Sequence, residues 1–499
     1  MVVSISKFIT ALVAFVSLAA ALAPIAIKNN KFVDMNGDPF IIVGVDYQPG
    51  GPAIYSDSAS SDVLSDADVC LRDAFLLQSL GVNTIRIYTV SPWLNHDACM
   101  SILNAVGIYV ILDVNSPLSG ESINRYQPQD SYNRGYIGRV FAILDAFIGY
   151  PNVLGFFAGN EVINDATSAG VAPPYMRAVQ RDMKNYIARH SNRTIPVGYS
   201  AADDSALRVA GWEYLQCTNS DEDVQMSRSD FYGLNSYSWC SGRDNFQTSG
   251  YSSLISTFAN SSIPLIFSEF GCNVIRPRTF TEINGGVYTP QMMYVFDGGL
   301  IYEYSEEANN YGLVTIDSDG SVTLSAEFVN LQNAYANITY TEISSDATID
   351  SVEPPHCNAD AIKTLDSSFD SSLSLPPCPA QDLLENGSGN NNLGRWIPLS
   401  DMATNFSITD ANGNEITDKS INDVSNQTYY YTSVTSSPAT SSSTATPTST
   451  STSTPAISTS NDPSTTSTTV STSTSGAMMS STSSNMLLVI LGFLGVTLL

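Results

Sequence analysis

Eight short apolar segments recur at long intervals between residues 40 and 302, and they constrain the fold more than any other feature of the sequence. The intervals are too long for β-hairpins. Apolar strands that alternate with helices are typical of a parallel sheet covered by helices. Eight such repeats favour a (β/α)8 TIM barrel, of fold class α/β, over a doubly wound sheet. The segments are 40–45, 84–88, 109–114, 154–158, 195–199, 231–235, 264–267 and 299–302.

Helix signals occupy the intervals between these segments. Ser65, followed three residues later by Asp68, predicts a helix that begins near residue 66. Gly81 predicts where this helix ends, because glycine readily adopts the left-handed conformation of a helix C-terminus. Helices are also expected over residues 133–148 and 175–190. The order of elements is therefore strand, helix, strand, as the barrel requires.

The ends of the apolar segments carry carboxylates, amides and tyrosines. In a parallel barrel the functional side chains lie at the carboxyl ends of the strands, so these are the candidate site residues. Tyrosines at a barrel mouth can stack on sugar rings. The residues at the strand ends are Asp46, Tyr47, Gln48, Tyr88, Asp113, Asn115, Asn160, Glu161, Asn235, Tyr237, Ser268, Glu269, Tyr302 and Glu303.

Glu161 and Glu269 follow the fourth and seventh segments and make the pair of carboxyl groups that glycoside hydrolysis requires. One carboxyl group protonates the leaving oxygen, and the other attacks the anomeric carbon. Strands four and seven face each other across a barrel mouth, so we expect the retaining geometry, with the carboxyl groups about 5–5.5 Å apart. Their proximity favours a proton on one of them.

Composition and motifs exclude several other functions. The net charge of −27 and the sequence pI near 4.2 argue against nucleic-acid binding. The three histidines, at positions 96, 190 and 356, lack ligand spacing, and no P-loop or dinucleotide fingerprint occurs, so we expect no metal and no cofactor. Charged residues make up only 14% of the chain, against about 25% in ordinary soluble domains, which suits a protein that works among sugars.

The N-terminal segment has the form of a secretory signal peptide over residues 1–23. Lys7 precedes an apolar run that closes on the small residues Ala19, Ala21 and Ala23. The alternative is a signal anchor, although the apolar run is short for a membrane span. Pro24 disfavours a cut directly after Ala23, so the cleavage position stays open by a few residues.

The C-terminal part predicts a stalk and an anchor. Residues 432–475 are almost entirely Ser, Thr, Ala and Pro, as in disordered O-glycosylated stalks. Residues 476–499 end in an apolar tail after a polar spacer, which fits a glycosylphosphatidylinositol (GPI) attachment propeptide with Ser475 or Gly476 as the attachment site. A transmembrane helix is the alternative. We therefore expect a cell-surface protein, held at the plasma membrane, in the cell wall, or in both.

Sequons and cysteines agree with a secreted protein. Seven cysteines in an oxidising compartment should form three disulfides and leave one thiol. N-glycosylation sequons stand at Asn192, Asn260, Asn337, Asn386, Asn405 and Asn426.

Six motifs occur in a fixed order along residues 25–360. They are Tyr47-Gln48-Pro49-Gly50-Gly51, Ile85-Arg86-Ile87-Tyr88, Gly159-Asn160-Glu161-Val162, Tyr237-Ser238-Trp239-Cys240, Phe267-Ser268-Glu269-Phe270-Gly271, and Tyr304-Ser305-Glu306 with Asn309-Asn310-Tyr311-Gly312-Leu313-Val314. In these motifs the chain resembles the fungal GPI-anchored β-1,3-glucanosyltransferases of glycoside hydrolase family 72.

The resemblance implies roles for individual residues. Glu161 would be the acid/base and Glu269 the nucleophile, in agreement with the strand argument. Asp204 could replace its neighbour Asp203 among the sugar contacts. With Tyr237 added because it ends a strand, the expected substrate-binding residues are Tyr88, Asn115, Ser116, Glu121, Ser122, Ile123, Asn160, Asp203, Arg208, Tyr237 and Tyr302.

The resemblance also implies a cysteine framework and domain limits. The implied disulfides are Cys70–Cys99, Cys217–Cys357 and Cys240–Cys272, which leave Cys378 unpaired. Longer family members continue into a Cys-rich carbohydrate-binding module, and only Cys378 follows Cys357 here, so that module is absent. We expect a catalytic domain over residues 24–340 and a polar extension over 341–431, closed onto the barrel by a disulfide, whose structure the sequence does not indicate.

The expected activity is transglycosylation on β-1,3-glucan. The chain would cleave an internal linkage and transfer the new reducing end to the non-reducing end of a second glucan, as a monomer with glucan donor and acceptor as partners. A secreted endo-β-1,3-glucanase would use the same two carboxylates, so the residues alone do not separate transfer from hydrolysis. A structural wall glycoprotein would need only the stalk, sequons and anchor.

Overall fold

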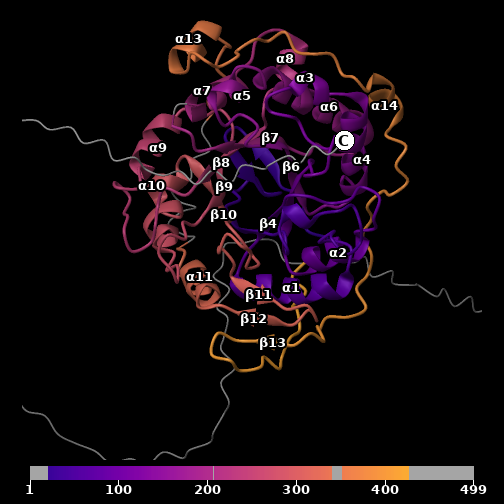
Figure 1. Ribbon diagram of the computed structural model, residues 1–499, viewed down its shortest axis with the longest axis vertical. Coiled ribbons are helices and arrows are strands. Elements are labelled where there is room, and N and C mark those ends of the chain that lie inside the picture. Colours follow the sequence, from indigo (N-terminus) through magenta and orange to yellow (C-terminus); the bar gives the residue numbers. More distant parts are fainter. Residues whose placement is uncertain (1–20, 206, 340–350, 426–499) are drawn as a thin grey trace, which may run out of the picture. The chain divides into compact units, whose positions relative to one another are not determined.

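The computed structural model describes residues 21–205, 207–339 and 351–425. At its centre eight parallel strands close into a barrel in the order β10-β3-β4-β5-β6-β7-β8-β9 (Figure 1). This confirms the predicted TIM barrel, and each of the eight apolar segments contributes one strand. The barrel strands are β3 Ile42–Asp46, β4 Thr84–Ile87, β5 Tyr109–Asp113, β6 Val153–Asn160, β7 Val197–Ala202, β8 Phe231–Ser236, β9 Leu265–Phe270 and β10 Phe296–Ile301.

Helices follow the barrel strands and pack around them (Figure 1). Those on the barrel are α1 Ala67–Leu80, α2 Asp97–Ala105, α3 Pro128–Ser131, α4 Arg134–Phe147, α5 Ala166–Ala169, α6 Pro173–His190, α7 Leu207–Gln216, α8 Glu222–Met226, α9 Tyr251–Phe258, α10 Pro290–Met293 and α11 Ala326–Ala336. A short 3-10 helix spans Pro52–Ile54 and a π-helix spans Ile283–Val287.

The predicted start of α1 was wrong by one residue. Asp66, not Ser65, caps the helix, because its Oδ1 atom accepts from the backbone N–H groups of Asp68 at 3.0 Å and Val69 at 3.2 Å. The Ser65 hydroxyl donates instead to the carbonyls of Ala59 and Asp62, so it is not available as a cap. Gly81 ends the helix with φ of 82°, as predicted.

An N-terminal hairpin packs against the amino ends of the barrel strands. It consists of β1 Ala26–Lys28 and β2 Lys31–Val33. Phe32 belongs to an apolar cluster with Tyr109 and Phe231, which begin β5 and β8. The buried ammonium group of Lys31 pairs with Asp297 Oδ1 at 2.7 Å and so ties the hairpin to β10. The hairpin therefore belongs to the barrel core.

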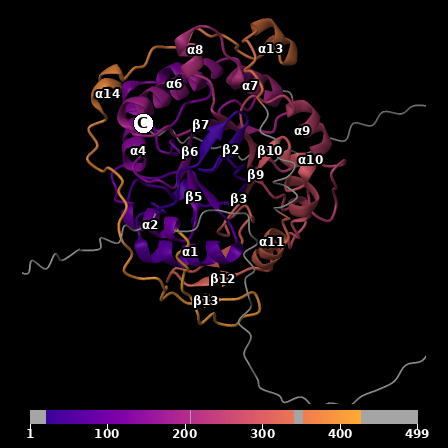
Figure 2. The ribbon, with the colours of Figure 1, turned by 180° about the vertical axis from the view of Figure 1, so that it is seen from behind.

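Residues 351–425, here called the C-terminal strap, run along the outside of the barrel (Figure 2). The side chain of Asn390 donates to the carbonyls of Pro92 at 2.9 Å and Ala142 at 3.0 Å. The backbone N–H of Val424 donates to the carbonyl of Ala105 at the end of α2. The strap thus packs on the barrel helices. Its elements are α13 Ala359–Leu365, α14 Gln381–Asn386 and β13 Ile408–Thr409, and β13 joins a three-stranded sheet with β11 Val314–Ile316 and β12 Val322–Leu324.

Three disulfides link Cys70 to Cys99, Cys217 to Cys357, and Cys240 to Cys272, the pairs that the resemblance implies. The second joins the strap to the chain just after α7. The Cys378 thiol is free and half-buried. Within the described residues, no helix combines the length and apolar character needed to cross a membrane. The expected stalk, the attachment site and most of the signal peptide lie outside the described residues.

Residues 22–25 bear on the expected signal cleavage. Leu22 and Ile25 are each 3% exposed and pack in the same apolar cluster as Phe32. The backbone N–H of Leu22 donates to Asn104 Oδ1 at 3.0 Å, and the carbonyl of Ala23 accepts from the Tyr109 hydroxyl at 2.6 Å. A cut after Ala23 would remove both contacts from the mature protein.

We therefore predict that the mature chain retains Leu22. Ala19 and Ala21 supply the pair of small residues that precedes a cut after residue 21. N-terminal sequencing of the secreted protein should give Leu22 as its first residue. A mature chain that starts at Pro24 or later would contradict this prediction.

Candidate active site

Glu161 lies just beyond the carboxyl end of β6 in a fixed conformation. Its φ is 49°, in the left-handed region that residues other than glycine rarely adopt. Its backbone N–H donates to the carbonyl of Ser200 in β7 at 2.8 Å. Such strained positions persist only where the surroundings enforce them, and they cluster at functional sites.

A buried amide orients the Glu161 carboxylate. Asn235 Nδ2, at the end of β8, donates to Glu161 Oε1 at 2.9 Å and to Asn160 Oδ1 at 3.0 Å. Asn235 Oδ1 accepts from the hydroxyls of Ser200 at 3.0 Å and Ser268 at 2.7 Å. These five residues lie on or directly after β6, β7, β8 and β9, so four neighbouring strands position one carboxylate.

Glu269, in β9, is held by three donors. The Tyr88 hydroxyl donates to Oε1 at 2.9 Å, and the Tyr237 hydroxyl donates to Oε2 at 2.7 Å. Arg86 Nη1 donates to Oε1 at 3.1 Å. Both oxygens therefore have partners, which fixes the orientation of the carboxylate and stabilises its charged form.

The titration of Glu269 reflects opposing effects. Burial raises the pKa of its carboxyl to about 7, and the charge of Glu161 adds to the rise. The Arg86 guanidinium and the hydroxyls of Tyr237 and Tyr88 oppose it. Burial also raises the pKa values of both tyrosines well above their ordinary value, so each hydroxyl keeps its proton and remains a donor.

Asp46, at the end of β3, lies in the same acidic cluster. It is fully buried, and neither of its carboxyl oxygens has a hydrogen-bond partner in the described part of the chain. Burial raises its pKa well above the ordinary value; Arg86 lowers it, and Glu269, Asp113 and Glu303 raise it. The protonated, neutral form of Asp46 is therefore favoured. The positive charge of Arg86 is then balanced by Asp113 and Glu269.

Aromatic rings surround the nucleophile candidate. Tyr302 makes edge contacts with Tyr88, Tyr237 and Tyr311, with ring centroids 6.3, 6.2 and 5.2 Å apart. The structure thus brings together the three tyrosines that the strand ends indicate. Tyr311 was not among the predicted contacts, although it lies in one of the six motifs.

Asp203 and Arg208 form an ion pair with Oδ1 and Nη1 2.5 Å apart. The Ser236 hydroxyl, at the end of β8, donates to the other carboxylate oxygen of Asp203 at 2.7 Å. Asp204 instead accepts from the backbone N–H of Leu207 at the start of α7. Of the two aspartates, Asp203 is the one connected to the carboxyl end of the barrel.

The polar residues of the loop after β5 that are predicted as sugar contacts make hydrogen bonds and an ion pair within the protein. The Asn115 side chain donates to the carbonyl of Ala158 and accepts from the Tyr136 hydroxyl. Ser116 donates to Glu121, and Glu121 pairs with Arg139 at 2.6 Å. Ile123 is buried in the core, and Ser122 is exposed. No hydrogen bond in the described structure joins these side chains to either catalytic candidate.

Sequence reasoning missed the roles of Arg86 and Asn235. Arg86 lies inside a predicted apolar segment. A single charged residue in such a segment is the signal that could have indicated a buried charged partner. Asn235 is one of the strand-end candidates, but the sequence assigns it no role in orienting Glu161. In the described residues, no group of three or more His, Cys, Asp or Glu side chains is arranged to hold a metal ion.

Comparison with known proteins agrees with this geometry. The family model described as glucanosyltransferase, Glyco_hydro_72, matches residues 14–339. The chain is 48% identical over 437 residues to a Saccharomyces cerevisiae protein named probable 1,3-beta-glucanosyltransferase GAS3, with 83% of this chain and 82% of that protein covered. It is 46% identical over 414 residues to 1,3-beta-glucanosyltransferase gel2 of Aspergillus fumigatus, with 82% and 85% covered.

A solved structure supports the same assignment. Saccharomyces cerevisiae Gas2p in complex with laminaritriose and laminaritetraose superposes with a TM-score of 0.63 and 39% sequence identity. The match covers 72% of this chain and 78% of Gas2p. A family model spans most of the barrel, and the relatives align over most of their length. The chain therefore belongs to glycoside hydrolase family 72, the glucanosyltransferases.

Proposed function

We propose that this family 72 1,3-β-glucanosyltransferase uses Glu269 as nucleophile and Glu161 as acid/base in a retaining two-step transfer between β-1,3-glucan chains. The observation that carries the proposal is the placement of two oriented carboxylates at the carboxyl ends of the barrel strands: Asn235 holds Glu161 directly after β6, and Tyr237 holds Glu269 in β9. The polysaccharide is inferred from the relatives, since Gas2p binds laminari-oligosaccharides.

In the first step a Glu269 carboxylate oxygen attacks the anomeric carbon of the donor glucan. A bond forms between that oxygen and the anomeric carbon, the glycosidic bond breaks, and the departing oxygen takes a proton from Glu161. Tyr88, Tyr237 and Arg86 hold the attacking carboxylate in place before the reaction, which reduces the reorganisation that the step requires.

In the second step the ionised Glu161 removes the proton from the 3-hydroxyl of an acceptor glucan. The hydroxyl oxygen bonds to the anomeric carbon, and Glu269 leaves as a carboxylate. Asn235 keeps Glu161 in one orientation through both steps. Asn160 Nδ2 donates to no acceptor in the described structure and is available for a sugar hydroxyl, whereas Asn160 Oδ1 is held by Ser200 and Asn235.

The cell-surface location is also part of the proposal. Three disulfides indicate folding in an oxidising compartment. The five sequon asparagines within the described residues are exposed. A GPI anchor attached at Ser475 or Gly476, after removal of the apolar terminal segment, would place the barrel where wall glucan is available.

Products longer than the donor distinguish transfer from hydrolysis. We expect the secreted enzyme, incubated with one defined β-1,3-glucan oligosaccharide, to yield a ladder that extends above the starting length. Mass spectrometry of the products at early times checks this. A ladder that contains only shorter products would support the alternative of an endo-β-1,3-glucanase.

Replacement of each glutamate by alanine should separate the two roles. On an oligosaccharide with an activated aryl leaving group, Glu161→Ala should form the glycosyl-enzyme, and added azide should displace Glu269 to give a product of retained β configuration. In Glu269→Ala, azide should enter directly and give the α product. Nuclear magnetic resonance of the glycosyl azides reads the configuration.

The matched control for this experiment is Glu385→Gln, on exposed α14, which should keep full activity. On natural glucan, Glu161→Gln should lower kcat by about 10²–10⁴-fold, the usual contribution of a general acid. Equal configurations from the two alanine variants would contradict the assignment.

The pH profile should respond with opposite signs to two substitutions. Since Glu269 must be ionised and its pKa is raised to about 7, kcat/KM should rise with pH through about 7. Glu161→Gln removes the acidic neighbour that helps to raise the pKa of Glu269 and should move this acidic limb to lower pH. Tyr237→Phe removes a donor to the carboxylate and should move it to higher pH. Initial rates of aryl release across pH measure both shifts, and shifts in the same direction would contradict the account.

A further inference from the structure

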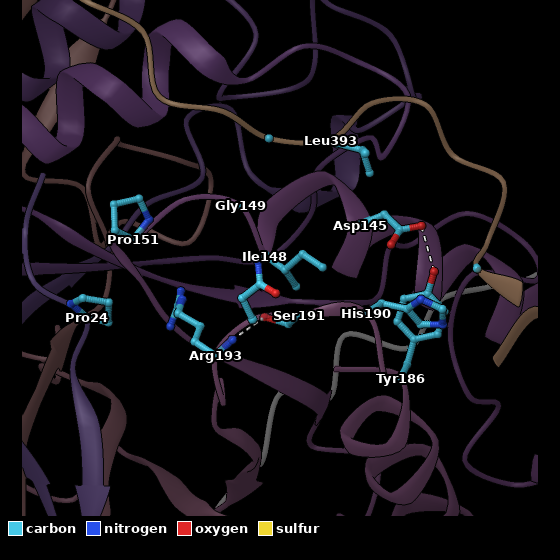
Figure 3. Close-up of a pocket in the computed structure, with 13 residues that line it drawn as sticks. Pro24, Asp145, Ile148, Gly149, Pro151, Tyr186, His190, Ser191, Arg193 and Leu393 are labelled. Carbon is cyan, nitrogen blue, oxygen red and sulfur yellow. Dashed lines mark hydrogen bonds between the residues drawn. The ribbon is translucent and has the colours of Figure 1, made fainter. Parts of the chain in front are cut away.

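A hollow of about 540 Å³ lies on the outside of the barrel (Figure 3), and neither catalytic glutamate is among the residues that line it. Its walls come from the ends of α4 and α6, from the loops that lead into β6 and β7, and from strap residues 387–394. Loops that enter strands lie at the amino ends of a parallel barrel, whereas the chemistry is at the carboxyl ends. The hollow therefore has no part in the reaction described above. Its volume lies within the range of about 300–1,000 Å³ typical of small-molecule sites.

The polar groups on one wall already have partners. The Tyr186 hydroxyl donates to Asp145 Oδ2 at 2.8 Å (Figure 3). The Ser388 hydroxyl donates to the same oxygen at 2.5 Å. His190 Nε2 lies 2.9 Å from the carbonyl of Leu384 in α14. These contacts tie the strap to α4 and α6, so the wall is preformed.

Apolar side chains also line the hollow. The side chain of Leu393, in the strap, is 61% exposed. Ile148, Pro151 and Pro24 also line the hollow (Figure 3). An apolar wall of this kind gains free energy when a ligand with an apolar face covers it.

Asn192 lies in the lining of the hollow and is exposed. With Thr194 it forms the sequon Asn192-Arg193-Thr194. The loop around it is fixed, because Arg193 Nη2 donates to the carbonyls of Tyr150 at 3.0 Å and Val153 at 2.8 Å. The amide that would carry a glycan is thus held at the edge of the hollow.

We propose that the hollow binds the first N-acetylglucosamine residues of a glycan attached to Asn192. Attachment joins the Asn192 amide nitrogen to the first sugar carbon, with loss of the amide proton and of the lipid diphosphate carrier that supplies the glycan. The C–H face of a pyranose ring can pack on Leu393 and Pro151. The acetamide groups offer hydrogen-bond donors and acceptors to the polar residues that line the hollow.

A covalent tether makes even weak recognition sufficient. A ligand linked by a short connection is present at an effective concentration in the millimolar range, so its binding needs little intrinsic affinity. Because the hollow joins the α6–β7 loop to the strap, a sugar held there links two segments that are about 200 residues apart in the chain. The glycan thereby stabilises the packing of the strap on the barrel.

The test is protection of one glycan in the native protein. The full-length protein, secreted from a yeast host, is treated with an endoglycosidase that cleaves between the first two sugars, and occupancy is read by glycopeptide mass spectrometry. We expect the Asn192 glycan to be released at least tenfold more slowly than glycans at other occupied sequons such as Asn260 and Asn405. Denaturation should abolish the difference.

A surface variant separates recognition from occupancy. Leu393→Ser should leave Asn192 glycosylated but make its glycan as sensitive as the others, whereas Leu365→Ser, at another exposed leucine of the strap, should change nothing. Asn192→Gln should lower the unfolding midpoint more than Asn260→Gln and leave kcat/KM unchanged. The proposal is overturned if Asn192 is unoccupied, or if its native glycan is released as fast as the others.

Discussion

The buried guanidinium of Arg86 is the group on which the active site depends. It is fully buried, pairs with Asp113 through Nη2 at 2.8 Å and through Nε at 3.0 Å, and reaches Glu269 at 3.1 Å. The rings of Tyr88 and Phe157 lie within 4.4 and 4.8 Å of its central carbon. A buried charge without partners costs several kcal/mol, so the strands that supply these partners must keep their register. The position of the nucleophile thus depends on the places that β4, β5 and β9 occupy in the closed barrel.

The same arrangement explains why several acidic side chains can share one barrel mouth. Arg86 compensates Asp113 and Glu269, and burial raises the pKa of Asp46 well above its ordinary value. Glu161 depends on a different partner, the amide of Asn235, which carries no charge. The two glutamates therefore have unlike surroundings, one charged and aromatic, the other an uncharged set of amides and serines. Unlike surroundings are what allow two chemically identical groups to perform different steps.

Much of this arrangement could be predicted from the sequence, for a physical reason. Buried parallel strands are continuous apolar runs, and a polar residue directly after such a run must lie at one end of the barrel, so Glu161 and Glu269 could be found without coordinates. Partners across strands could not be found in this way. Asn235 and Arg86 acquire their roles from side chains far away in sequence. The bonds within the loop that holds Asn115 and Glu121 could not be found either, because composition does not reveal which polar residues there satisfy one another and nearby backbone.

The C-terminal strap lacked a sequence signal because it has little core of its own and no periodic apolar pattern. Its stability comes from hydrogen bonds and contacts to helices that belong to the first half of the chain, such as those of Asn390. This connectivity has a consequence for biosynthesis. Chains emerge from the ribosome N-terminus first, and domains generally fold as units. Helices α2 and α4 are synthesised long before the residues that cover them. The outer surface of the barrel therefore stays uncovered until translation has nearly finished.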